Sequence, residues 1–365
     1  MKRIIYIVLL FLGIYTSSCQ TSSLKKTNSI ESKEMKKYDI DAASCSPRFY
    51  PNEIVFGKFS LEDGYELYIP KGNSEHLGWG NAGSLHVGGP DLKAIPVMLD
   101  ITWLSFVEKK FYTGRFKLDK ELIAELFRKG YKDSRNIQET FSTVMAGMAP
   151  GGVVVVWLGG GDARVEVGRY QAKETHKVTK EDIIPHAIIS VEEYIEEILK
   201  EDLEESHQNK EFMNNIPFGL WDTYREKYTW KPSIVFDGDG KMITVYLECY
   251  NAERTNTAAE NPEITNFKKR AIPKYVNLTW EDKKGNKYGA DIYFGNLYGS
   301  VDKIYKEMED EIFNAFKNIF KDEEHQAELL FKIDKYNSAI SIYLKNKTDS
   351  IAIKKVKMEV YSIEE

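Results

Sequence analysis

The folded part of the chain opens with β-rich segments on either side of a turn signal. Residues 54–61 and 65–69 are rich in β-branched and aromatic side chains, and Asp63-Gly64 lies between them. Asp-Gly in this position favours a tight turn, because glycine readily adopts the positive φ that such turns need. The pattern therefore predicts a β-hairpin.

Apolar runs predict further strands downstream. One strand is expected to end at Trp103, with Phe111–Leu118 as its return strand. Val153–Trp157 is apolar at every position, which is typical of a strand buried on both faces. Glycines after that run predict a turn into another strand over Arg164–Tyr170.

Helical periodicity marks three segments. Asp119 is the expected N-cap of a helix that continues through Lys129, and Ser190 with Glu193 forms a capping box for a second helix. A third helix is predicted over Val301–Phe320. The expected apolar faces are Leu122, Ile123, Leu126 and Phe127 in the first, Val191, Tyr194, Ile195, Ile198, Leu199 and Leu203 in the second, and Val301, Ile304, Tyr305, Met308, Ile312 and Ile319 in the third.

Part of this pattern recurs later in the chain. Residues 94–103 and 271–280 share Ala-Ile-Pro, five variable residues and Thr-Trp, at a displacement of 177 positions. Asp239-Gly240 predicts a second hairpin, and the runs Leu329–Ile333 and Ala339–Tyr343 match the Val153 and Arg164 strands. We therefore predict an α+β protein of two duplicated, mostly antiparallel β-sheet units (β-β-β-β-α-β-β) joined by a helical insert. Chance similarity between β-rich stretches is the alternative.

The N-terminus has the layout of a bacterial lipoprotein signal. Two positive charges precede an apolar run over Ile4–Tyr15, which is too short to span a bilayer as a mature helix. Ser17-Ser18 before Cys19 resembles a lipoprotein cleavage site, so we expect lipid attachment at Cys19. An ordinary signal peptide cut nearby is the alternative. The residue after Cys19 is Gln20 and not Asp, which favours sorting to the outer membrane. No acidic cluster follows Cys19, which favours a protein that faces the periplasm.

The expected domain organisation follows from these signals. It comprises a signal peptide over residues 1–18, a flexible tether over 19–45, a first α+β unit over 46–180, a helical insert over 181–231 and a second unit over 232–365.

Charge and motif content narrow the classes of partner. The chain has a net charge of −6, which becomes −8 when the signal removes one Lys and one Arg. This acidity argues against nucleic acid and anionic membrane surfaces as partners, because both attract basic proteins. No phosphate-loop or cofactor motif is present, so no cofactor is expected. The glutamates of the insert helix are interpreted as a solvated face, with an acidic partner-binding ridge as the alternative.

Candidate binding residues surround the first copy of the repeat. Trp79 lies in a glycine-rich loop that has no aromatic counterpart in the second half, and His86 and Asp91 follow on the same loop. Glu108 and Tyr112 come shortly after the repeated segment. Since tryptophan and tyrosine dominate binding hot spots, we expect this region to recognise a partner. Alternatively, Trp79 packs within its own unit.

Signals for catalysis, metals and disulfides are weak. Ser84 and His86 are close in sequence, but Ser84 lacks a Gly-x-Ser-x-Gly setting, and the histidines are too scattered to predict a metal site. Cys45 and Cys249 either form a disulfide in an oxidising compartment or remain two separate thiols. Trp103 and Trp280 occupy equivalent positions of the repeat and are predicted to be core residues.

Several motifs together resemble a known family. Gly78-Trp79-Gly80, Trp103–Tyr112, Pro150–Trp157 and Gly168–Ala172 resemble the bacterial lipoprotein family called domain of unknown function 2931. The resemblance covers roughly residues 65–175 and transfers no catalytic residue. Members of such families often lie beside interbacterial toxin systems, so the resemblance implies an immunity lipoprotein as one role.

We therefore expect a non-enzymatic, lipid-anchored periplasmic binding protein. Its unknown protein partner would be a toxin effector that it neutralises or an envelope protein that it scaffolds. Two alternatives stay open: a glycan- or lipid-binding module that uses Trp79, and a hydrolase that uses the Ser84/His86 loop.

Overall fold

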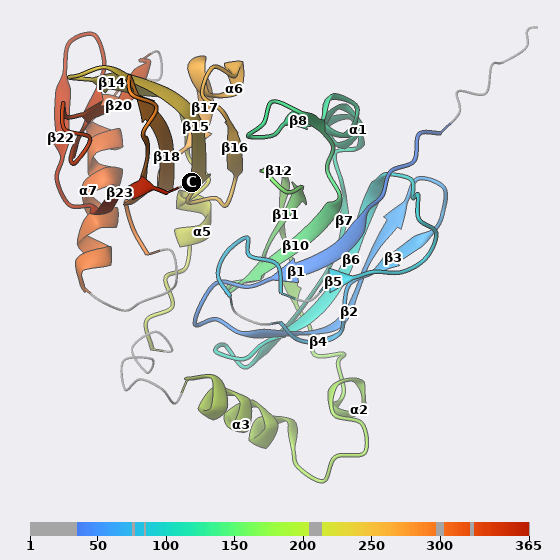
Figure 1. Ribbon diagram of the computed structural model, residues 1–365. Coiled ribbons are helices and arrows are strands. Elements are labelled where there is room, and N and C mark those ends of the chain that lie inside the picture. Colours follow the sequence, from blue (N-terminus) through green and yellow to red (C-terminus); the bar gives the residue numbers. More distant parts are fainter. Residues whose placement is uncertain are drawn as a thin grey trace, which may run out of the picture. The chain divides into compact units, whose positions relative to one another are not determined.

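The computed structural model describes residues 35–74, 77–83, 85–203, 214–296, 303–321 and 325–364. From Lys36 onward the chain forms one compact unit. Strands make up most of its regular structure and helices are few, which gives an α+β protein dominated by β-sheet (Figure 1).

The first half of the chain consists of short and long strands and one helix, α1. Its elements are β1 (Asp41–Cys45), β2 (Asn52–Leu61), β3 (Glu66–Tyr68), β4 (Gly72–Ser74), β5 (Leu85–His86), β6 (Pro96–Ser105), β7 (Lys110–Lys117), α1 (Lys120–Lys129), β8 (Tyr131–Lys132), β9 (Gln138–Glu139), β10 (Thr143–Ala149), β11 (Val153–Gly159), β12 (Ala163–Gln171) and β13 (Lys173–Glu174).

A helical insert leads into the second half. The insert contains α2 (Lys180–Ile183), α3 (Val191–Leu203) and α5 (Leu220–Thr223). The second half contains β14 (Lys227–Phe236), β15 (Gly240–Cys249), β16 (Arg254–Ala258), α6 (Pro262–Thr265), β17 (Lys268–Ala271), β18 (Pro273–Asp282), β19 (Lys287–Tyr293), α7 (Lys303–Ile319), β20 (Ala327–Ile333), β21 (Ile340–Lys345), β22 (Ser350–Ile353) and β23 (Lys357–Ile363).

The main strands form three sheets. The largest has ten strands in the order β23-β19-β18-β15-β16-β12-β11-β10-β1-β5. A six-stranded sheet has the order β13-β7-β6-β2-β3, with β4 also paired to β2, and a five-stranded sheet has the order β17-β14-β20-β21-β22. The ten-stranded sheet passes from the first half to the second where β12 pairs with β16.

Strand pairing follows the same pattern in both halves. β2, β6 and β7 form an antiparallel meander, as do β15, β18 and β19. Trp103 lies opposite Ile54, and Trp280 lies opposite Met242, which are the third residues of β2 and β15. A register shift follows at the same place in each pair. β1 pairs in parallel with β10, and β14 pairs in parallel with β20.

The sequence-based strand order needs correction. Each half has an additional strand at its start (β1 and β14), and β10 intervenes between α1 and the Val153 strand. By its pairing, the run Leu329–Ile333 corresponds to β10 and not to the Val153 strand. Asp237–Gly240 joins β14 to β15, which lie in different sheets, so the hairpin predicted there is wrong.

The segment expected to be a flexible tether contains a buried strand. β1 lies between β10 and β5, and its residues Ala42, Ala43, Ser44 and Cys45 are buried. These small side chains face closely packed neighbours on both sides and therefore produce no alternation of hydrophobic and polar positions. Likewise, β14 begins before the expected boundary at residue 232.

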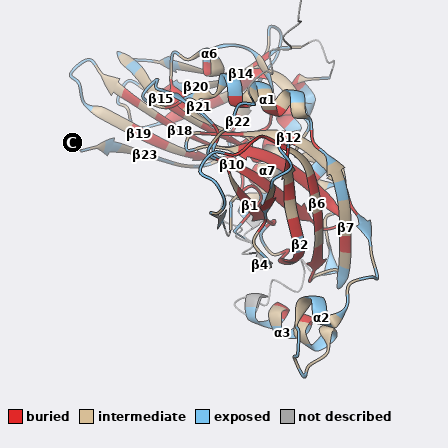
Figure 2. Ribbon diagram, turned by 90° about the vertical axis from the view of Figure 1, so that its right-hand side faces the viewer, coloured by how far each residue is buried: buried red, intermediate tan, exposed pale blue. Residues whose placement is uncertain are grey.

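The core contains both repeated tryptophans, as predicted. Trp103 and Trp280 are buried, and each stacks on a tyrosine of the next strand. Many positions of the surrounding strands β2 and β6 are buried as well (Figure 2). The ring centroids are 5.4 Å apart for Trp103 and Tyr112 and 5.8 Å apart for Trp280 and Tyr288.

Local capping fixes the helix starts. Asp119 accepts a hydrogen bond of 2.9 Å from the Leu122 N–H at the start of α1, as predicted.

The apolar face predicted for α7 is only partly correct. Met308, Ile312 and Ile319 are buried, but Ile304 in the first turn is 62% exposed, so the prediction is wrong at Ile304. The helix packs on β21 and β22.

Candidate functional site

The glycine-rich loop places its tryptophan in the core and not on the surface. Trp79 is 7% exposed, and its ring meets that of Trp157 edge to face with centroids 5.0 Å apart. Tyr50 and Trp221 belong to the same buried cluster. The structure therefore contradicts an exposed binding role for Trp79 and supports its packing within the protein.

Glu108 and Tyr112 are in contact, and their contacts are structural. The Glu108 carboxylate accepts hydrogen bonds of 2.8 Å from the Ser105 hydroxyl, 2.8 Å from the Tyr112 hydroxyl and 3.1 Å from the Gly151 N–H. Burial, together with the charge of Glu108, raises the pKa of Tyr112. These bonds hold the β6–β7 hairpin against the turn between β10 and β11.

Among the described residues, the remaining candidates do not form a catalytic arrangement. Asp91 is exposed. The backbone of His86, in β5, pairs with that of Ala42, in β1. Ser84 and Cys19 lie outside the described residues, so the hydrolase and the lipid anchor stay predictions. Within the described ranges, no three His, Cys, Asp or Glu side chains are placed to hold a metal ion.

Cys45 and Cys249 are separate, buried thiols, so the structure contradicts a disulfide between them. Burial raises the pKa of the Cys45 thiol to about 12, although a hydrogen bond with the backbone of Gly80 and the charge of Arg164 lower it. Burial also raises the pKa of the Cys249 thiol. Both side chains therefore stay protonated and unreactive at neutral pH.

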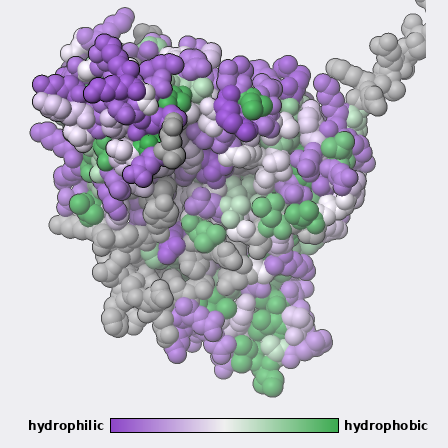
Figure 3. All heavy atoms as spheres, viewed as in Figure 1, coloured by the Kyte–Doolittle hydropathy of each residue, from purple (hydrophilic) through white to green (hydrophobic). Residues whose placement is uncertain are grey.

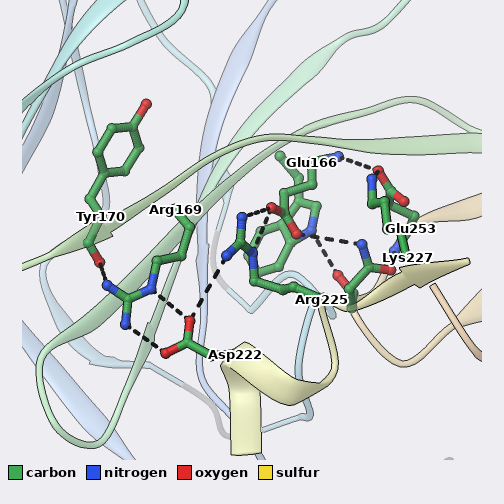
Figure 4. A network of polar contacts seen from close by, with 9 residues as sticks. Glu166, Arg169, Tyr170, Asp222, Arg225, Lys227 and Glu253 are labelled. Carbon is green, nitrogen blue, oxygen red and sulfur yellow. Dashed lines mark hydrogen bonds and ion pairs between the residues drawn. The ribbon is translucent and has the colours of Figure 1, made fainter. Parts of the chain in front are cut away.

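A charged network joins β12 to α5 and the second half of the chain (Figure 4). Arg169 forms two hydrogen bonds with Asp222, of 2.8 and 2.9 Å, and Arg225 donates one of 2.7 Å to Glu166. Burial raises the pKa of Glu166, and Arg225 opposes that rise. Because these carboxylates are already bound by arginines, the network serves to dock the two halves.

Arg164 is the buried centre of the same junction. It is 6% exposed and donates hydrogen bonds to the carbonyls of Ala252, at 2.5 Å, and Gly80. The Glu248 carboxylate, also buried, lies 3.8 Å away. Burial lowers the pKa of Arg164, and Glu248 opposes this effect. No sequence pattern marks Arg164 as a junction residue, because its partners are distant along the chain.

Among the described residues, the most exposed large apolar side chain lies between α2 and α3. We call residues Ile183–Ile189 the isoleucine loop; its sequence is Ile-Ile-Pro-His-Ala-Ile-Ile. Ile188 is fully exposed, at 101% relative to an extended reference, and Ile183, Ile184 and Ile189 are partly exposed. In the space-filling view, apolar residues gather over this segment at the lower end (Figure 3). The apolar run was visible in the sequence, but its exposure was not.

Local hydrogen bonds cap the helix starts on either side of the isoleucine loop. Thr179 and Asp182 form a capping box at the start of α2, with the Thr179 N–H donating to Asp182 at 2.8 Å. At the start of α3 the Ser190 N–H donates to Glu193 at 2.7 Å. The two capped helices therefore fix both ends of the loop.

Helix α3 anchors the loop to the body of the protein. Ile195 and Leu199 pack against Leu104 and Phe106, as the predicted apolar stripe requires. The Tyr194 hydroxyl donates a hydrogen bond of 2.9 Å to Glu53, whose pKa burial raises.

The outer side of α3 is acidic. Glu196 pairs with Lys109 at 3.2 Å, whereas three other exposed glutamates have no ion pair with a described residue. These are Glu192, Glu197 and Glu201. Together the isoleucine loop and this acidic face form an apolar surface with a negatively charged border.

Fold and surface together define an α+β protein, rich in β-sheet, that presents a preformed apolar loop. The chain belongs to the family described as "Protein of unknown function (DUF2931)", whose model matches residues 25–219, more than half of the chain. This match spans the first half and the isoleucine loop and confirms the family predicted from the motifs. No curated protein and no solved structure matches the chain. Among the described residues, no helix is long and apolar enough to cross a membrane.

Proposed function

We propose that this protein is a non-enzymatic binding protein that engages a protein partner through the isoleucine loop. The observation that carries the proposal is the full exposure of Ile188 on a loop held by two capped helices. Monomeric proteins rarely maintain such a preformed apolar projection without a partner to cover it. Inhibitors and scaffold proteins commonly bind through preformed surfaces of this kind.

The charge around the loop selects the chemistry of the partner. Glu192, Glu197 and Glu201 lie on the adjoining helix, and the chain as a whole has a net charge of −6. A partner with an apolar socket bordered by Lys and Arg side chains would complement this surface and be attracted to it over long range. An anionic membrane surface would be repelled.

We further propose that the protein acts from the bacterial envelope, anchored through Cys19 to the outer membrane and facing the periplasm. The signal-like N-terminus and the family resemblance support this location and favour an immunity or scaffolding role. Replacing Cys19 by serine should move the protein from the membrane fraction to the soluble fraction, because acyl chains supply the binding energy. Retention of the variant in the membrane fraction would disprove the anchor.

The two halves, in this proposal, arose by duplication. The support is the common pairing pattern: the same third-residue partner for each repeated tryptophan, and the same register shift after it. An experimental structure in which the β15–β18 register differed from that of β2–β6 would contradict a duplication.

Site-specific photo-crosslinking tests the proposed surface. A benzophenone amino acid at position 188 should give a covalent adduct with one basic protein in cells of the native host. Position 304 is the matched control, because Ile304 is also an exposed isoleucine, at 62%, but lies on α7. The absence of an adduct at 188, or identical adducts from both positions, would contradict the proposal.

A further inference from the structure

A second surface feature lies at the edge of the six-stranded sheet. Pro70 separates the short edge strands β3 and β4, both of which pair with β2. Proline lacks the N–H that a continuous edge strand would donate, so the ladder breaks here. The break leaves an open groove of about 410 Å³, lined by Phe56, Gly57, Tyr68, Ile69, Pro70 and Lys71.

Aromatic rings form the walls of this groove. Phe56 is 37% exposed and Tyr68 is 47% exposed. A strand register shifted by one residue would turn both side chains towards the core. Their neighbours fix the direction: Phe59 and Leu67, which pair across β2 and β3, fill the core on the opposite face. The rings therefore project from the outer face of the sheet.

Polar groups border the rings. Lys58 forms an ion pair with Glu66, and the Tyr68 hydroxyl donates a hydrogen bond of 2.8 Å to the same carboxylate. Lys71 is exposed and forms no ion pair with another described residue. The Glu66 carboxylate is thus already bound, and the Lys58 ammonium lies 5.7 Å from the centroid of the Phe56 ring. The groove itself combines the Phe56 and Tyr68 rings with the exposed Lys71 ammonium.

We propose that this groove binds a sugar ring of a glycan. The C–H face of a pyranose carries partial positive charge and stacks on the negative face of an aromatic ring, while its hydroxyls need nearby donors and acceptors. A purely apolar ligand would leave the exposed Lys71 ammonium without a partner. The volume falls within the usual range of ligand sites, roughly 300–1,000 Å³. This proposal does not depend on the isoleucine loop.

Binding to two defined oligosaccharides tests the groove. Chitotetraose serves as a neutral probe and tetragalacturonate as an acidic probe, each titrated into the purified full chain by calorimetry. At least one should bind, and Phe56→Ala or Tyr68→Ala should each weaken that binding by about tenfold. Lys71→Ala should also weaken it.

Matched controls make the result decisive. Tyr336 is 72% exposed with the Lys335 ammonium 4.8 Å from its ring centroid, so Tyr336→Ala removes a similar aromatic–lysine pair outside the groove. This variant should bind like the unaltered protein, and thermal unfolding checks that all variants fold. Binding of neither probe, or equal loss with Tyr336→Ala, would overturn the proposal without affecting the isoleucine loop.

Discussion

Replacing Arg164 by alanine is expected to lower the free energy of unfolding by about 3–5 kcal/mol, the usual cost of breaking a buried ion pair. The change leaves the buried Glu248 carboxylate without its cation, 3.8 Å away, and removes the donors for the carbonyls of Gly80 and Ala252. Urea denaturation of the two proteins measures the difference. The loss arises at the junction of the two halves, where β12 pairs with β16.

Arg115→Ala is the matched control for this substitution. Arg115 lies 3.5 Å from Asp100, and its side chain is 71% exposed. An exposed pair contributes about 0–1 kcal/mol, so little stability should be lost. If both arginine variants were equally stable, Arg164 would not hold the junction together.

Replacing Glu108 by alanine should cost about 2–4 kcal/mol, because a single carboxylate accepts hydrogen bonds from Ser105, Tyr112 and Gly151. Glu108→Gln should cost less, since the amide retains one acceptor oxygen. The same denaturation experiment measures both changes. Glu196→Ala is the control, because its exposed pair with Lys109 should contribute little.

A Glu108→Ala variant of unchanged stability would contradict the structural role. It would also reopen the prediction that Glu108 and Tyr112 recognise a partner.

The parts of the fold that were predictable depend on local chemistry. The helix starts after Asp119 and Ser190 follow from side chains that cap the first turn within three residues of themselves. The hairpin of β2 and β3 follows from Asp63-Gly64 between β-rich segments. The buried β11 strand follows from an unbroken run of apolar residues.

The parts that were missed depend on contacts far apart in sequence. β1 consists largely of small buried residues and has no visible period, so only its pairing with β10 reveals it. The glycines around Trp79 leave a binding role and internal packing both open, and only its contact with Trp157, many residues away, decides for packing. Arg164 resembles any surface arginine until Gly80 and Ala252 are brought to it.

Exposure was the hardest property to predict for the candidate site. Four isoleucines within residues 183–189 are typical of a buried segment. In the structure α3 packs on Leu104 and Phe106, whereas these isoleucines are partly or fully exposed. The proposed binding surface is therefore recognised from the exposure of this loop and not from a motif.

The central claim is that the isoleucine loop binds a basic partner, and affinity measurement with the crosslinked partner tests it most directly. Ile188→Lys should weaken binding by about 30- to 100-fold, because it places a positive charge in an apolar contact facing a basic surface. Ile304→Lys should leave the affinity unchanged. Equal affinities for the unaltered protein and both variants would contradict the proposed binding surface.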